Sequence, residues 1–113
     1  MEQIIYDTDL ISNAHSPVQD VFNYWANSTF PWLVKAFSEG IGVGAYIAGC
    51  DFTSGGVHFE SDYTNDITIS FDDLYHYMNL ASQRYIINHP LDKAKIEQYL
   101  KAFRDRFLIS SKK

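Results

Sequence analysis

The chain has 113 residues, of which 46% are apolar and 16% aromatic, and its formal net charge is −5. This length and composition predict one globular domain over residues 1–113 with its own hydrophobic core. A single cysteine excludes an internal disulfide and favours a reducing compartment. The sequence shows neither a signal peptide nor an apolar run long enough to span a bilayer, so we expect a cytoplasmic protein with no membrane contact.

The charge is divided unevenly along the chain. Residues 1–83 hold eleven acidic side chains and one basic side chain, Lys35, whereas residues 84–113 hold eight of the nine Lys and Arg. Carboxylates without neighbouring cations project a negative potential into solvent, and this potential attracts positively charged molecules. The division therefore favours a basic partner and argues against a nucleic-acid ligand.

The N-terminal third is predicted to form two short helices. The first begins at Ser16, which acts as its cap, while Gln19 completes a capping box. Pro31 interrupts the helical pattern, and a second helix is predicted over residues 32–38, with Gly40 just beyond its end. Three apolar side chains are expected to tether the preceding segment to the core: Ile4, Ile5 and Leu10.

The middle of the chain is predicted to form a small antiparallel sheet of about three strands. The strands are expected over residues 43–50, 57–61 and 67–71, with a glycine turn at 54–56 and a polar loop at 62–66. Because side chains alternate along a strand, Val57 and Phe59 should face the core, while His58, Glu60 and Asp62 share the outer face.

Two longer helices are predicted after the sheet. Asp72 and Asp73 favour the start of the first helix, and its buried stripe consists of Leu74, Met78, Ala81 and Tyr85. Pro90 separates it from the last helix, whose stripe consists of Ile96, Leu100, Phe103 and Phe107. The predicted fold class is therefore α+β, with the sheet packed against N-terminal and C-terminal helices.

The patterns that indicate catalysis or cofactor binding are incomplete. Gly40, Gly42 and Gly44 follow a helix and precede a strand, the reverse of a nucleotide-binding loop, so we expect them to serve backbone packing. The four histidines lack metal-ligand spacing, and the 62–66 loop lacks the pattern of a calcium loop. Cys50 has no activating base nearby and is expected to be buried. We therefore predict no catalytic residue, no metal and no cofactor.

His58 and Glu60 leave an enzymatic interpretation open. The two residues share one predicted strand face, where a carboxylate beside an imidazole suits acid–base catalysis. A solvated polar strand face explains the same pattern, and we favour that interpretation.

Acidic side chains form the strongest candidate for a binding site. Six lie within 23 residues with no Lys or Arg between them: Asp51, Glu60, Asp62, Asp66, Asp72 and Asp73. Phe52, Phe59, Tyr63 and Tyr75 are interleaved with them, and of these Phe59 is expected to face the core. Because soluble proteins ordinarily intersperse charges of both signs, this pattern favours a binding surface for a cationic partner. We expect the first contributions from Glu60, Asp62 and Asp66, followed by Asp51, Tyr63, Asp72 and Asp73.

Residues 40–100 resemble the immunity proteins of bacterial contact-dependent growth inhibition, in particular the group that neutralises ribonuclease toxins. The similarity rests on Gly42-Val43-Gly44 leading to Gly49-Cys50, on Gly56-Val57-x-Phe59, on Phe71-Asp72-Asp73-Leu74-Tyr75-x-Tyr77-Met78, and on Leu80-Ala81-Ser82-x-Arg84-Tyr85 before His89-Pro90 and Asp92-Lys93-x-Lys95-Ile96. This resemblance implies a small α+β protein that binds one cognate toxin, the C-terminal nuclease domain of a CdiA protein, and blocks it stoichiometrically without catalysis.

We therefore predict an immunity protein whose acidic side chains occlude the active site or substrate groove of a nuclease toxin. Binding at a distance from the toxin's active site is also compatible with the sequence. Two alternatives stay open: a small enzyme that uses His58 and Glu60 as an acid–base pair, and an acidic mimic of nucleic acid that binds another basic protein.

Overall fold

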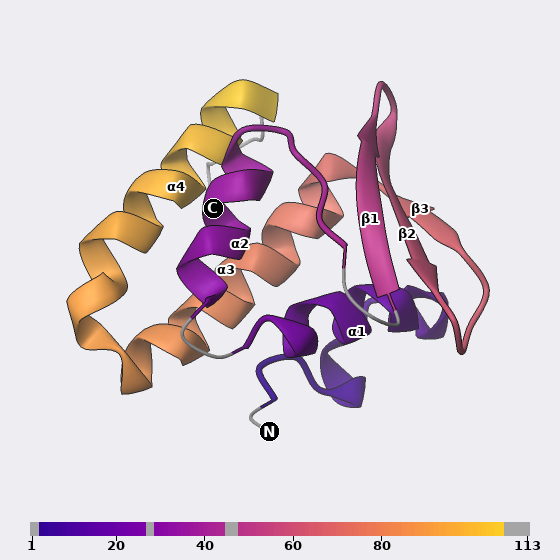
Figure 1. Cartoon of the computed structure of the whole chain (residues 1–113), viewed down its shortest axis with the longest axis horizontal. Helices are drawn as coiled ribbons and strands as arrows, with labels where there is room; N and C mark the ends of the chain where they lie inside the picture. The colour runs from indigo at the N-terminus through magenta and orange to yellow at the C-terminus, as the bar shows by residue number, and fades with distance from the viewer. Residues whose placement is uncertain (1–2, 27–28, 45–47, 108–113) are drawn as a thin grey trace.

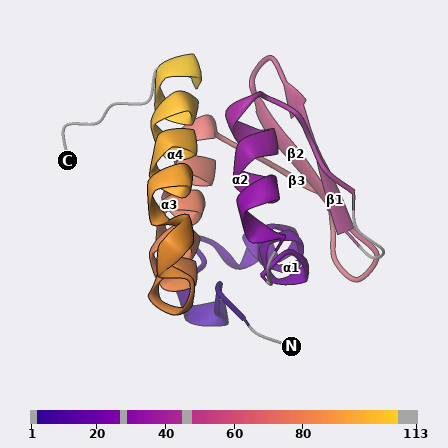
Figure 2. The same cartoon turned by 60° about the vertical axis from the view of Figure 1, so that its left-hand side comes forward.

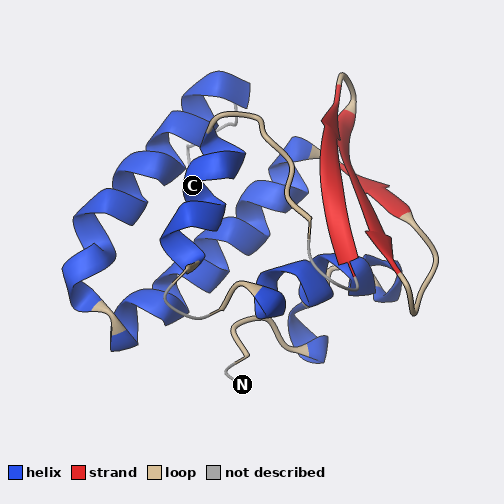
Figure 3. Cartoon of the chain, in the orientation of Figure 1, coloured by secondary structure: helices blue, strands red, loops and turns tan. Residues whose placement is uncertain are grey.

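The computed structural model describes residues 3–26, 29–44 and 48–107. Within these ranges the chain forms four α-helices and a three-stranded antiparallel sheet with strand order β1-β2-β3 (Figure 1). The helices and the strands occupy separate parts of the molecule (Figure 3), and the helices lie on one side of the sheet (Figure 2). This arrangement confirms the predicted α+β class.

Helices α1 (Ser16–Tyr24) and α2 (Phe30–Ser38) lie close to their predicted positions. The predicted capping box at the start of α1 is wrong. A 3-10 turn, Asn13–His15, leads directly into the helix, so Ser16 is its first residue and its hydroxyl donates to the Asn13 carbonyl. Gln19 instead donates to the Ile5 carbonyl and the Asp7 carboxylate. Helix α2 ends as predicted, with Gly40 in the left-handed region at φ +73°.

The sheet is a meander of β1 (Ala48–Thr53), β2 (Gly56–Ser61) and β3 (Ile67–Ile69). Its register pairs Asp51 with His58, and His58 in turn with Thr68. Val57 and Phe59 are fully buried, as the alternation predicts. The inner face of the sheet therefore packs against the helices, and the side chains of His58 and Glu60 point to the other face.

The first strand differs from the prediction over residues 43–50. Within the described residues, β1 covers 48–53, and the predicted positions 45–47 lie outside them. Gly44 instead forms an isolated bridge with Gly49, and the Val43 carbonyl accepts a hydrogen bond from the Cys50 amide at 2.9 Å. Residues 42–44 thus run beside β1, because glycine at position 42 lets the two backbones approach closely.

The third strand is shorter than predicted and passes into a helix at once. Ser70 accepts a hydrogen bond from the Asp73 amide and caps α3 (Phe71–Asn88), so Phe71 is helical and not part of the strand. Helix α4 (Lys93–Phe107) follows a short 3-10 turn that begins at Pro90. The two predicted stripes are confirmed, since all but Phe107 of their residues are buried.

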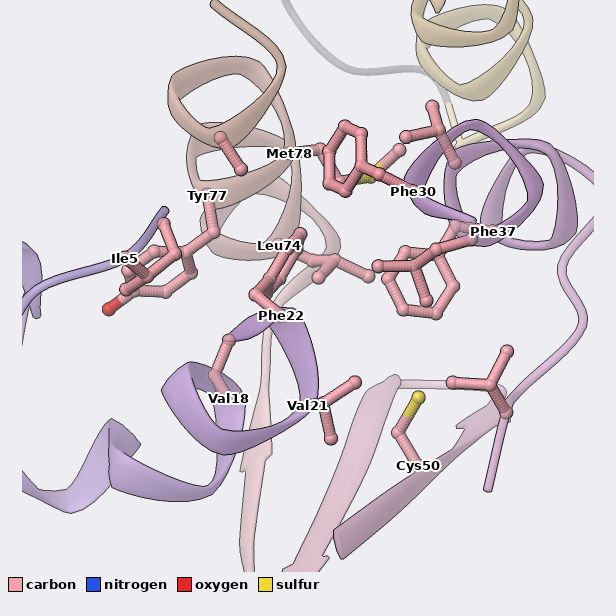
Figure 4. Packing of buried hydrophobic residues seen from close by; sticks show 14 of the residues in the cluster. Ile5, Val18, Val21, Phe22, Phe30, Phe37, Cys50, Leu74, Tyr77 and Met78 are labelled. Atoms are coloured by element: carbon pink, nitrogen blue, oxygen red, sulfur yellow. The ribbon is translucent and has the colours of Figure 1, made fainter. Parts of the chain in front are cut away.

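The core forms where α1, α2 and α3 meet the inner face of the sheet (Figure 4). Phe22 and Phe37 make an edge-to-face contact, with their ring centroids 6.0 Å apart. Phe52 of β1 contacts Phe37 and Phe107, and so joins the sheet to α2 and α4. These aromatic contacts hold the strands in place and leave the outer face of the sheet without a helical cover.

The segment before α1 is built into this core. Ile4 and Ile5 are buried, which confirms the predicted tether. The Asn23 side chain accepts from both of their amides and donates to the Ile5 carbonyl. Arg84 of α3 donates to the Ile4 carbonyl and to both carboxylate oxygens of Asp9. The N-terminal segment therefore forms an integral part of the fold.

Candidate functional site

A hollow of about 480 Å³ lies at the end of the sheet where β1 begins and β2 ends. One wall is the segment that runs beside β1, and the opposite side is formed by the end of β2 and the loop that follows it. Four carboxylates line it: Asp51, Glu60, Asp62 and Asp66. We call this feature the acidic hollow. Its remaining lining consists of Gly42, Val43, Gly44, Ala48, Gly49, Cys50 and Ser61.

The strand register explains why these carboxylates meet. Glu60 lies opposite Gly49, so the position across from the Glu60 side chain is left without a side chain. Asp51 is paired with His58, two residue pairs further along the strands, so its side chain points to the same face as that of Glu60. Asp62 comes directly after β2, two residues beyond Glu60, and so continues the same face. Asp66 immediately precedes β3. All four side chains belong to exposed residues.

These carboxylates have no cationic partner from Lys or Arg among the residues that the structure describes. The described Lys and Arg that form ion pairs lie elsewhere, for example Lys101 with Asp105 on α4 and Arg84 with Asp9. Ser61, which also lines the hollow, donates to Asp20 of α1 at 3.0 Å and so fixes the end of β2 against that helix. The hollow therefore presents negative charge that no described Lys or Arg compensates.

The other predicted site residues lie outside the hollow. Tyr63 is 73% exposed in the loop between β2 and β3. Asp72 and Asp73 are in the first turn of α3, where their charges favour the helix dipole. Of the interleaved aromatic residues, Phe52 and Tyr75 are partly buried and pack against core rings. The structure thus brings four of the seven predicted residues together.

His58 contacts Asp66 and Thr68, and not Glu60, its partner in the enzymatic alternative that the sequence left open. His58 Nδ1 lies 3.0 Å from the Thr68 hydroxyl, and its Nε2 lies 3.3 Å from a carboxylate oxygen of Asp66. Both contacts cross from β2 to the next strand and the loop before it. Residues on adjacent strands are closer neighbours here than residues two apart on one strand. The acid–base pair that the sequence left open is therefore not formed.

Other chemistry near the hollow is limited. Burial raises the pKa of the Cys50 thiol to about 12, so this thiol stays protonated at neutral pH and is a poor nucleophile. Gly42 has the packing role expected of it, because a Cβ there would lie 2.1 Å from the Cys50 carbonyl oxygen. Within residues 3–26, 29–44 and 48–107, no group of three His, Cys, Asp or Glu side chains is arranged to hold a metal ion.

Sequence reasoning missed two contributors to the site. In the wall, residues 43 and 44 were predicted to begin a strand and Gly42 to serve backbone packing, and neither pattern indicated that they line a site. The contact between His58 and Asp66 depends on the register of β2 and β3, and the seven residues between His58 and Asp66 carry no signal for it. A strand pairing drawn with His58 opposite Thr68 would have indicated both contacts of the imidazole.

Comparison with known proteins gives one match. A family model described as CDI immunity protein, where CDI is contact-dependent growth inhibition, matches residues 14–100. The matched segment includes the whole acidic hollow. No curated protein and no solved structure was found to match the chain. In the described part of the chain, the helices are too short or too polar to cross a bilayer. Since the match covers well over half of the sequence, the chain belongs to the CDI immunity protein family.

Proposed function

We propose that this chain neutralises the nuclease toxin of its own contact-dependent growth inhibition system by binding it through the acidic hollow. Membership of the family supports an immunity role. We choose this surface because four carboxylates line the hollow and, among the described residues, none of them has a Lys or Arg partner. An open, negatively charged face of this kind fits a basic partner.

The proposed mechanism is occlusion. A nuclease must hold a polyanionic substrate, and it does so with Lys and Arg side chains along its groove. The carboxylates of the hollow would pair with those cations and deny the groove to RNA. Such inhibition is stoichiometric and requires neither a catalytic residue nor a cofactor of this chain. The toxin is expected to be a ribonuclease, and the complex is expected to form in the bacterial cytoplasm.

Glu60, Asp62 and Asp66 are the first candidates for contact, together with Asp51. Tyr63 stands in the adjoining loop with most of its ring exposed, where it is suited to pack against the rim of a partner surface. Asp72 and Asp73 are secondary candidates, since their position also serves the start of α3. Loss of one desolvated carboxylate from an interfacial charge pair costs about 2–5 kcal/mol of binding free energy.

The decisive experiment is co-expression with the toxin domain encoded immediately upstream, scored by growth and by co-purification. The wild-type chain should restore growth and form a one-to-one complex. The variant E60Q/D62N should bind more than about tenfold more weakly, because it removes two charges from the hollow. A matched control, E97Q/D105N, removes two exposed carboxylates from α4 and should bind like the wild type.

The outcomes separate the function from the surface. If the wild-type chain neither restores growth nor forms a complex, the proposed function is refuted. If it does both and E60Q/D62N binds with unchanged affinity, the immunity role stands and the hollow is not the contact surface.

A further inference from the structure

We infer that His58 positions Asp66 at the acidic hollow and that its protonation weakens the binding of a cationic partner, which makes binding depend on pH. This inference deepens the proposed function and rests on it. It follows from the contacts of one imidazole ring on the outer face of the sheet.

The ring bridges two segments of the chain. His58 lies at the centre of β2, directly opposite Thr68 of β3. Its Nδ1 contacts the Thr68 hydroxyl at 3.0 Å, and its Nε2 contacts the Asp66 carboxylate at 3.3 Å. Asp66 ends the polar loop that closes one side of the hollow. The imidazole therefore ties the orientation of an acidic side chain at the hollow to the middle of the sheet.

Both protonation states of the imidazole fit these contacts. In the neutral ring, Nε2–H donates to Asp66 and Nδ1 accepts from the Thr68 hydroxyl. In the charged ring, both nitrogens donate, and the Thr68 hydroxyl turns from donor to acceptor. Because a hydroxyl serves in either role, the charge of His58 can change without a rearrangement of the backbone.

The groups that face this ring are acidic. Asp51 on β1 is its direct cross-strand neighbour, Glu60 shares its face of β2, and Asp66 contacts it from the loop before β3. The helices lie on the other side of the sheet (Figure 2). Among the described residues, no Lys or Arg forms an ion pair with these carboxylates. Protonation of His58 therefore adds one positive charge to a face that is otherwise negative.

The sign of the effect follows from this charge. Imidazole side chains change charge between about pH 5 and 8. At the lower pH the ring repels an incoming cation and holds Asp66 more strongly, so association slows. The imidazolium charge and a cation about 7 Å away in water repel each other with about the thermal energy. This repulsion slows association by about threefold.

The test measures association with the catalytically inactive toxin domain at about pH 8 and pH 5.5, at low ionic strength. Wild-type association should be about threefold slower at the lower pH, after correction for any pH effect that the wild type and the variants share. H58Q keeps a hydrogen-bonding side chain but no titrating charge, and should lose this difference. H76Q alters an exposed histidine of α3 and should keep it. An H58Q variant with the full wild-type pH dependence would overturn the inference.

A second measurement uses the free chain and no toxin. The ¹³C resonance of the Asp66 carboxyl should follow the titration of His58 in the wild type and in H76Q, and this step should disappear in H58Q. If the Asp66 resonance does not follow the titration of His58, the positioning role is refuted, whatever the result with the toxin. If Asp66 responds and no toxin binds at either pH, the proposed function fails while the coupling of the two side chains stands.

Discussion

Asp9 and Arg84 form the contact that fastens the N-terminal segment to α3. Arg84 donates to both carboxylate oxygens of Asp9 and to the Ile4 carbonyl, and its guanidinium also lies over the Tyr6 ring at 5.1 Å from the centroid. The hydrogen bonds from Arg84 lower the pKa of the Asp9 carboxyl below its ordinary value of 3.8. This bidentate geometry is the strong form of an ion pair.

We predict that D9N lowers the free energy of unfolding by about 2 kcal/mol at pH 7. A carboxyl whose pKa is lower in the folded state stabilises the protein above its unfolded-state pKa. This stabilisation is lost as the pH falls through the folded-state value, so the difference between D9N and wild type should be smaller near pH 3. Urea unfolding of both proteins at pH 7 and pH 3 measures this difference in the free energy of unfolding.

The control is D105N, which breaks an exposed pair between residues one helical turn apart on α4. Such pairs contribute at most about 0.5 kcal/mol, so D105N should resemble the wild type at both pH values. A D9N difference that is equally large at pH 7 and pH 3 would show that the lost stability does not come from the ionised carboxylate.

At this scale the sequence predicts residue character better than residue partners. The acidic group between positions 51 and 66 follows from composition, because no cation interrupts it. Arg84 was counted with the basic C-terminal part, yet it pairs with an acidic residue 75 positions earlier. Pairs of that separation depend on how the helices pack, and no local pattern encodes them.

At the scale of elements, the segment that runs beside β1 forms one wall of the acidic hollow. The segment and the strand approach closely at Gly42, where an added Cβ would lie 2.1 Å from the Cys50 carbonyl oxygen and 2.9 Å from the Asp51 Cα. Both of these atoms belong to backbone, which cannot move aside as a flexible side chain would. Only glycine therefore fits this position without displacing the strand or the segment.

We predict that G42A lowers the free energy of unfolding by about 1–3 kcal/mol, the usual range for overpacking. It should also weaken toxin binding, because the wall of the hollow and the backbone of Asp51 must move apart. Thermal unfolding and affinity for the toxin domain are the two measurements.

Gly44 offers a matched control in the same wall. A Cβ at this position would meet no atom of the described residues within 4 Å, so G44A should leave stability nearly unchanged. If G42A and G44A behave alike, the close approach at position 42 does not determine the shape of the wall.

The elements with long apolar stripes were the most predictable. The stripes of α3 and α4 each extend over three turns, which separates them clearly from strands. The boundary between β3 and α3 was misplaced because Phe71 continues the strand alternation and is also the first residue of the helix. Ser70 followed three residues later by Asp73 is a helix-start pattern, and giving it more weight would have corrected the boundary.

At the scale of the whole molecule, the lysines of α4 and the carboxylates of the acidic hollow lie apart. Helix α4, which carries several of the lysines, lies on the opposite side of the molecule from the sheet (Figure 1). Lys93 and Lys101 each pair with a carboxylate one turn further along this helix. Its positive charge is thus partly compensated locally, whereas the acidic hollow has no such compensation from the described Lys and Arg.

We predict that the association rate with the toxin domain falls steeply as salt rises from about 0.05 to 0.5 M, while dissociation changes less. Attraction between separated charges is screened by salt, and this long-range attraction acts mainly on association. Stopped-flow or surface-binding kinetics at several salt concentrations measure both rates.

E60Q/D62N should show a shallower salt dependence than the wild type, and E97Q/D105N should keep the wild-type slope. Association that is independent of salt in the wild type would rule out electrostatic steering. A slope that changes equally in both variants would mean that net charge, and not its position on the sheet, governs the encounter.

The attachment of the N-terminal segment bears on how the chain folds during synthesis. Ile4 and Ile11 bond to Arg84 and Tyr77, which follow them by 80 and 66 residues. Residues 4–11 therefore leave the ribosome long before their partners on α3, and contacts of such high sequence separation form slowly. Until α3 emerges, the contacts of Ile4 and Ile11 with this helix cannot form. We expect protection of the cell to begin only once translation has passed this helix.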